Sequence, residues 1–134
     1  MNISHGCYSG TEGNFDALRL MWSALAGYGL VDNREAGGPV MPNINYAAFN
    51  EGDYYGDWPD GAPEDPLLIL LVHYEHSGRI KYTHCPYLAD RLDQLEGKMM
   101  CGDGYFNPSW LLLTQQFARG LRTAAAYSQD VVFS

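Results

Sequence analysis

The sequence predicts a mostly helical α+β fold of about four helices, in a single domain that covers residues 1–134. Apolar residues recur with helical spacing in several stretches, and short apolar segments near the two ends, residues 2–7 and 130–134, have the length of strands. A stretch at about residues 33–65, rich in Gly, Pro, Asn and Asp, interrupts the helical pattern. We expect this stretch to be a long irregular loop. A chain of 134 residues is long enough to bury a core of its own.

The first helix is expected to begin at Asn14, a residue that favours the N-cap position. Apolar side chains follow on one helical face, at Leu18, Met21, Trp22 and Leu25, and Gly27 then ends the helix. Trp22 is the aromatic residue most expected in the core. A second helix, from residues 65–66 to about 74, is apolar on nearly all sides, which predicts a central, buried element.

The third helix is expected to open at residues 85–86 and to end at Gly97, and the fourth to run from residues 107–108 to about Tyr127. Gly120 lies inside this last helix, where glycine costs about 1 kcal/mol relative to alanine. Its presence suggests that another backbone packs closely against the helix. The two terminal segments, residues 2–7 and 130–134, are expected to pair as strands.

The segment 73–84 predicts an EF-hand-like corner between the second and third helices, with Gly78 for the turn and Ile80 directed into the core. Calcium is disfavoured because imidazoles stand at both ends of the loop, where calcium requires oxygen ligands. His73, Glu75 and His84 are an alternative ligand set for a softer metal such as zinc. A corner without metal is the interpretation we favour.

Net charge is −8, which disfavours nucleic acid as a partner and favours a basic protein surface. No apolar run is long enough for a membrane span, and the first residues lack the features of a secretory signal. A cytoplasmic location is therefore expected. Three cysteines at unrelated spacings form neither a disulfide framework nor a zinc motif.

A glycine-rich segment, residues 4–13, precedes the first helix and could offer backbone N–H groups to an anion. For a small anionic, nucleotide-like ligand, the expected lining is His5, Tyr8, Arg19 and Arg122. A turn that leads into a helix cap is the simpler interpretation. His5 and Cys7 are also considered as a nucleophile pair, but no third group orients them, and no catalytic residue is predicted.

Six acidic residues and interleaved aromatics make up residues 50–65, with no basic residue among them. Rigid aromatic side chains supply contact area, and the acids would select a basic partner. The residues expected to bind a partner protein are Tyr54, Tyr55, Asp57 and Trp58. A solvated acidic loop without a partner is the alternative.

Three segments together resemble a group of small bacterial and phage-type proteins with no established activity: "SHGCYSG", "DPLLILLVHYEHSGRI" and "QQFARGLRTAAA…VVFS". The resemblance covers most of the chain outside residues 33–62. Members of the group carry an Asp-Cys-acid-Gly run where this chain has "EHSG", so the later acid is not matched. The resemblance implies one compact domain and transfers no catalytic residue.

Taken together, these patterns predict a small, non-enzymatic binding protein without a cofactor. It would act as a phage-type inhibitor that sequesters a nucleotide-like signalling molecule or blocks a host defence protein. The alternatives are an acidic immunity protein that caps a basic toxin, and a metal-dependent enzyme that uses His73, Glu75 and His84. A homo-oligomer with pockets between subunits is compatible with the sequence.

Overall fold

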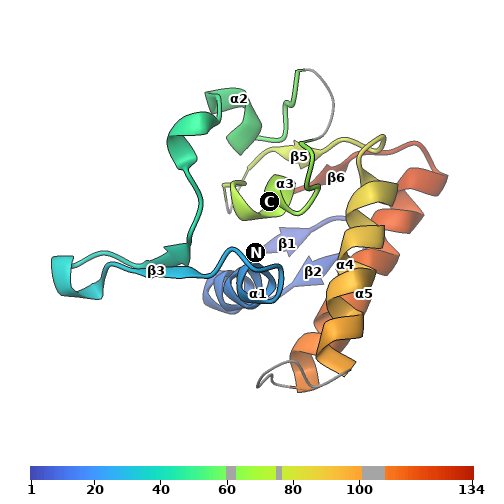
Figure 1. Ribbon diagram of the computed structural model, residues 1–134. Coiled ribbons are helices and arrows are strands. Elements are labelled where there is room, and N and C mark those ends of the chain that lie inside the picture. The colour runs from blue at the N-terminus through green and yellow to red at the C-terminus, as the bar shows by residue number, and fades with distance from the viewer. Residues whose placement is uncertain (60–62, 75–76, 101–107) are drawn as a thin grey trace.

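The computed structural model describes residues 1–59, 63–74, 77–100 and 108–134 (Figure 1). It confirms a mostly helical α+β fold with small antiparallel strand pairs. The α-helices of the described residues are α1 (Glu12–Leu25), α2 (Glu51–Tyr54), α3 (Leu68–Leu71), α4 (Cys85–Met100) and α5 (Pro108–Ala126). The strands are β1 (Asn2–Ile3), β2 (Tyr8–Ser9), β3 (Leu30–Asp32), β4 (Val40–Pro42), β5 (Arg79–Ile80) and β6 (Val131–Val132), with 3-10 turns η1 (Arg34–Ala36) and η2 (Tyr46–Ala48).

The two longest helices, α4 and α5, lie side by side along one flank of the molecule (Figure 1). Helix α4 buries leucines at helical spacing, as predicted from the sequence. Its predicted end at Gly97 is wrong, since the helix continues to Met100. Met99 is 1% exposed, and Lys98 Nζ donates to the carbonyl of Leu25 at 2.9 Å. These tertiary contacts of the last turn offset the low helix propensity of glycine.

An aromatic cluster joins α1 to α5. The ring of Phe117 lies 6.2 Å from that of Phe15 and 5.6 Å from that of Trp22, in nearly perpendicular contact with the latter. Trp22 is fully buried, as expected, and its indole N–H donates to the hydroxyl of Thr114 at 3.0 Å. Because a buried indole N–H needs an acceptor, this hydrogen bond fixes how α1 lies on α5.

The predicted pairing of the two termini is confirmed. Ile3 and Phe133 form an antiparallel bridge, and the backbone N–H of Asn2 donates to the carbonyl of Ser134 at 2.9 Å. With the pairs β1–β2 and β5–β6, this bridge makes one antiparallel strip in the order β2, β1, β6, β5 (Figure 1). The first strand was predicted to reach residue 7 but ends at Ile3, because residues 4–7 turn back to form β2.

Gly120 allows another backbone to approach α5 closely, as its place in a helix suggested. A Cβ atom at this position would lie 2.8 Å from the backbone N of Cys7 and 2.6 Å from its Sγ. The β1–β2 turn therefore packs directly on the surface of α5. Any side chain here would push the terminal strands away from the helix.

Two helices differ from the sequence-based bounds. Helix α1 begins at Glu12 rather than after Asn14, because Thr11 is the N-cap and its hydroxyl accepts from the backbone N–H of Asn14 at 3.1 Å. The second predicted helix is reduced to the single turn α3, although residues 69–72 are buried as expected. The N–H of Tyr74 donates across the chain to the carbonyl of Tyr54, so it cannot continue the helix.

Gly78 adopts the expected left-handed turn with φ +92°, and Ile80 is fully buried in β5. The EF-hand-like detail is not confirmed, since α3 is only four residues long. The loop predicted at residues 33–65 is also more ordered than expected: β4 pairs with β3 in a hairpin, and α2 follows. This hairpin extends away from the body of the molecule (Figure 1). Among the described residues, no helix has the length and hydropathy of a membrane span.

A tyrosine-lined cleft as candidate functional site

Two glycines, Gly56 and Gly78, let two chain segments cross at backbone contact. A Cβ on Gly56 would lie 1.5 Å from the carbonyl oxygen of Arg79, and one on Gly78 would lie 2.4 Å from that of Tyr55. Both glycines have a left-handed backbone, with φ +88° and +92°. Across the crossing, the N–H of Arg79 donates to the carbonyl of Tyr55 at 2.9 Å. The end of α2 is thereby held against the segment that follows α3.

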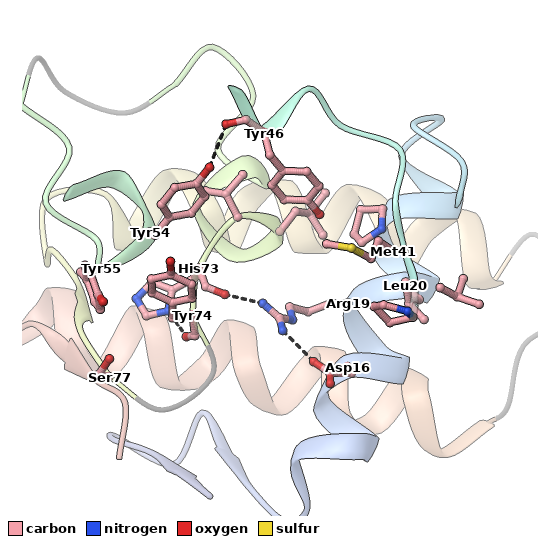
Figure 2. A pocket seen from close by; sticks show the side chains of 15 residues that line it. Asp16, Arg19, Leu20, Met41, Tyr46, Tyr54, Tyr55, His73, Tyr74 and Ser77 are labelled. Carbon is pink, nitrogen blue, oxygen red and sulfur yellow. Dashed lines mark hydrogen bonds and ion pairs between the residues drawn. The ribbon is translucent and has the colours of Figure 1, made fainter. Parts of the chain in front are cut away.

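Beside this crossing lies a cleft of about 690 Å³, which we call the tyrosine cleft (Figure 2). Its walls come from α1, the β3–β4 hairpin, η2, α2 and the segment after α3. The lining residues are Asp16, Arg19, Leu20, Pro39, Val40, Met41, Pro42, Tyr46, Tyr54, Tyr55, Leu71, Val72, His73, Tyr74 and Ser77. A volume of about 300–1,000 Å³ with mostly apolar and aromatic walls is usual for sites that bind small molecules.

Three of the four tyrosines form a packed cluster on one wall. The ring of Tyr74 lies 5.3 Å from that of Tyr54 and 4.9 Å from that of Tyr55. Tyr74 is 48% exposed and Tyr55 is 36% exposed, so part of each ring remains open to a ligand. The hydroxyl of Tyr54 donates to the carbonyl of Tyr46 at 2.8 Å, which ties the cluster to η2 (Figure 2). The wall is therefore rigid and aromatic.

Arg19 reaches from α1 to the backbone at the end of α3. Its guanidinium donates to the carbonyl of His73 at 2.6 Å, to that of Leu70 at 3.3 Å and to the carboxylate of Asp16 at 2.6 Å (Figure 2). The guanidinium also lies over the ring of Phe15, at 4.9 Å from its centroid. With a side chain only 11% exposed, Arg19 acts as a clamp between α1 and α3.

His73 is buried under the cleft and is held by two contacts. Its ring stacks on that of Phe133 at 3.9 Å, and its Nδ1–H donates to the carbonyl of Tyr74. Burial lowers the pKa of the His73 imidazole below its ordinary value, so the ring is neutral at pH 7. These contacts give His73 a structural role between the strand strip and the tyrosines.

The predicted ligand-binding set is not gathered into one site. Of its four members, only Arg19 lines the tyrosine cleft. His5, in the β1–β2 turn, forms a hydrogen bond with Gln129. The Tyr8 side chain is buried, and its hydroxyl donates to the carbonyl of Thr11. Arg122 pairs with two carboxylates of α4. Sequence spacing could not show that these four residues lie apart, because they come from three different parts of the fold.

The predicted partner-binding set is divided between the inside and the outside of the molecule. Tyr54 and Tyr55 line the cleft. Trp58 is 7% exposed and packs edge-on against Phe49 at 5.8 Å, so its contact area is already used by the core. Asp57 is exposed and pairs with Arg79 next to the glycine crossing.

The considered His5–Cys7 nucleophile pair is not supported by the geometry. Cys7 is fully buried against α5, whereas His5 lies in the preceding turn with φ +60°. Burial raises the pKa of the Cys7 thiol to about 12, so the thiolate that nucleophilic chemistry requires does not form near pH 7. The glycine-rich segment that was expected to bind an anion leads to Thr11, whose hydroxyl accepts a hydrogen bond from the N–H of Asn14 at the start of α1.

The alternative metal set of His73, Glu75 and His84 can be followed only in part, because Glu75 lies outside the described residues. Among the residues that are described, no group of three or more His, Cys, Asp or Glu side chains is placed to hold a metal ion. His84 is buried at the start of α4, and burial together with nearby Lys81 lowers its pKa. His73 and His84 thus each have a place in the packing of the fold.

Sequence reasoning missed two walls of the cleft: Tyr46 with Tyr74, and the β4 residues of the hairpin. Tyr74 was expected at the end of a helix, and the β4 segment was expected to be irregular. The available signal was indirect, namely ten tyrosines in the chain, many of them in residues 46–82. Which of these rings meet depends on the glycine crossing, which no local pattern encodes.

Comparison of the chain with protein-family models, with curated proteins and with solved structures finds no match in any of the three. The resemblance to small bacterial and phage-type proteins therefore stays an expectation from the sequence. No activity, ligand or partner can be transferred to the chain from a relative. The functional conclusion must come from the geometry of the tyrosine cleft.

Proposed function

We propose that the chain is a non-enzymatic binding protein whose ligand site is the tyrosine cleft. The observation that carries the proposal is a cleft of about 690 Å³ in which four tyrosines face apolar side chains of the β3–β4 hairpin. Such a site can accept a planar or apolar group between its walls. The partly exposed rings of Tyr55 and Tyr74 supply the contact surface.

The polar groups at the cleft favour binding over catalysis. The guanidinium of Arg19 is engaged by backbone carbonyls and by Asp16, and His73 is a neutral, stacked ring. An acid–base catalyst needs a titratable group within reach of the substrate and with a pKa near the working pH. Among the described lining residues, the structure supports orienting roles for these side chains and no proton-transfer role.

A concave cleft of this size favours capture of a compact group over contact with a flat protein surface. This supports the sequestration version of the inhibitor hypothesis, in which the protein withdraws a small molecule from solution. The version in which residues 50–65 block a host protein has less support, because Trp58 is buried and Tyr54 and Tyr55 belong to the cleft.

The test is a ligand search followed by mapping. Native mass spectrometry of protein isolated from its own host would detect a retained small mass, and amide chemical shifts on titration with that molecule would locate it. We expect the shifts to cluster at Val40, Met41, Tyr55 and Tyr74. The variant Tyr74→Ala should weaken binding at least tenfold, since aromatic contact surface is lost.

Tyr87→Ala is the matched control. Tyr87 is a 64% exposed tyrosine on α4 that does not line the tyrosine cleft. Its removal should leave affinity within twofold of the parent. Shifts that map instead to α4 and α5, or equal losses in the two variants, would contradict the proposal.

A further inference from the structure

We propose that the ligand of the tyrosine cleft is an organic cation, a guanidinium or alkylammonium group, rather than a phosphate-bearing or carboxylate-bearing molecule. This inference rests on the proposed binding function and specifies the chemistry of the same site. The charge of Arg19 is already paired within the cleft, whereas Asp16 and the tyrosine rings remain available to a ligand. The cation could be a free small molecule or an arginine or lysine side chain of a polypeptide, and the experiment below distinguishes these sources.

The single described cation among the lining residues is not presented to a ligand. The side chain of Arg19 is 11% exposed, and its guanidinium N–H groups donate to two backbone carbonyls and to the carboxylate of Asp16. An incoming anion would have to displace these charge-assisted hydrogen bonds and take away the guanidinium donor of the His73 carbonyl. Figure 2 shows the guanidinium directed to the backbone carbonyl of His73 and to the carboxylate of Asp16.

Among the described lining residues, the carboxylate of Asp16 is the negative group available to a ligand. Its side chain is 43% exposed, and it bonds to Arg19 through one oxygen, Oδ1. A carboxylate can accept several hydrogen bonds, so Oδ2 retains acceptor capacity at the cleft. A guanidinium or ammonium group can approach this oxygen without breaking the Arg19 clamp.

The tyrosine cluster contributes to the same preference. The face of a phenol ring carries negative electrostatic potential, so a cation over it is attracted. Tyr55 and Tyr74 are partly exposed and line the same cleft as Asp16, so the cleft offers a cation both aromatic faces and a carboxylate.

The net charge of the whole chain favours the same kind of ligand. With a net charge of −8, the molecule attracts cations over long range and repels phosphates. His73 does not oppose this field, since its buried ring is neutral at pH 7. The overall charge and the carboxylate of Asp16 therefore favour a cation, while the positive charge of Arg19 is paired within the cleft.

The experiment compares probes of one shape and three charges on the full chain. Benzylguanidinium is the cation, benzylurea is its neutral counterpart of nearly equal size, and phenylacetate is the anion. Isothermal titration at low salt should show benzylguanidinium binding at least fivefold more tightly than benzylurea, with no detectable binding of phenylacetate. The preference of the cation should decrease as salt is raised to 0.5 M.

Variants test the role of Asp16. Asp16→Asn should remove most of the preference for benzylguanidinium over benzylurea, and unchanged amide shifts outside the cleft should show that the variant is folded. Asp93→Asn is the matched control: Asp93 pairs with Arg122 and is 47% exposed, but it lies on α4 and does not line the cleft. It should leave the preference for benzylguanidinium unchanged.

The source of the cation is tested with a short peptide that contains one arginine and with the same peptide carrying citrulline. Tighter binding of the arginine peptide than of benzylguanidinium assigns the site to a polypeptide partner, and the reverse order assigns it to a small molecule. Both results support a cationic ligand.

Two outcomes separate this inference from the proposed function. If benzylurea or phenylacetate binds as tightly as benzylguanidinium, or if Asp16→Asn leaves the preference intact, the cleft binds ligands but the cation inference is overturned. If no probe of any charge produces heat or amide shifts at the tyrosine cleft, the inference and the proposed function both fail.

Discussion

The helical flank and the cleft side of this molecule are built in different ways. On the flank, α4 and α5 run for 16 and 19 residues and bury leucine, phenylalanine and alanine side chains at helical spacing. On the cleft side, the described part of residues 26–80 contains elements of two to four residues, joined by a glycine crossing and by hydrogen bonds between distant backbone groups. The flank depends on repeated apolar contact, and the cleft on a few specific approaches.

This difference suggests which region can be altered without losing the other. Contacts on the flank are shared by many side chains, so damage there should spread to the whole fold. The cleft depends on two glycines and one arginine clamp, so it should open locally while the long helices remain. The variants below test this distinction, from the largest expected effect to the smallest.

The largest effect is expected for Phe117→Ala on α5. Phe117 is fully buried and touches the rings of Phe15 and Trp22, so the change leaves a cavity at the centre of the aromatic cluster. We expect the free energy of unfolding to fall by about 4 kcal/mol. Urea unfolding followed by far-ultraviolet circular dichroism and by tyrosine fluorescence should give coincident transitions. Leu112→Ala, at a 66% exposed position of α5, should change stability by less than about 0.5 kcal/mol.

An intermediate and more local effect is expected for Gly56→Ala. The new Cβ would overlap the carbonyl oxygen of Arg79 and would stand in a left-handed backbone, and together these cost about 3 kcal/mol. Amide hydrogen exchange should show lost protection at Tyr74 and Arg79, whose N–H groups bond across the crossing. The amides of α4 and α5 should keep their protection.

Gly97→Ala is the control for this glycine change. Gly97 lies within α4, and a Cβ there would meet no atom within 4 Å. The substitution should raise the free energy of unfolding by about 0.5–1 kcal/mol. Equal loss of protection in both regions of Gly56→Ala would show that the cleft and the flank unfold as one unit.

The smallest effect is a pH dependence to which each region contributes one histidine. Burial lowers the pKa of His73 on the cleft side and of His84 at the start of α4. Below the unfolded value of about 6.5, the unfolded chain binds protons that the folded chain does not, so stability falls as pH decreases from 6.5 toward the folded pKa values. The slope reaches about 1.4 kcal/mol per pH unit for each histidine.

Urea unfolding at pH 7, 6 and 5 measures this dependence. His84→Gln and His73→Gln should each reduce the decrease, and the double variant should remove it. Asp65 does not affect the measurement between pH 7 and 5. Burial opposes its charged form, but hydrogen bonds from Arg91, Tyr28 and Leu67 lower its pKa overall. The stability that it contributes is therefore lost only below about pH 4. Stability that stays constant from pH 7 to 5 would contradict the prediction.

The sequence predicted the flank well because its signals are local. Apolar residues at helical spacing located α4 and α5, and Gly120 indicated the close backbone approach that Cys7 makes. The pairing of the termini also followed from two short apolar segments. Errors on this side were confined to element ends, such as Gly97, where a single tertiary contact outweighs a small propensity.

The cleft was predicted poorly because its signals are not local. Tyr54 and Tyr55 were assigned to a protein-binding loop, and Arg19 was grouped with His5, Tyr8 and Arg122, although Arg19 lies with the two tyrosines in one cleft. The expected second helix was stopped by the hydrogen bond from Tyr74 to Tyr54, which joins residues twenty positions apart. Such a contact has no trace in the pattern of either segment.

By itself, the sequence determined the helical flank and the overall negative charge, because burial of a periodic apolar face and the sum of charges need no knowledge of distant neighbours. Only the tertiary structure decided which tyrosines share a wall and that Arg19 is occupied by backbone carbonyls. The physical reason is that Gly56 and Gly78 allow two backbones to touch, and the side chains carried by those backbones meet only after that contact has formed.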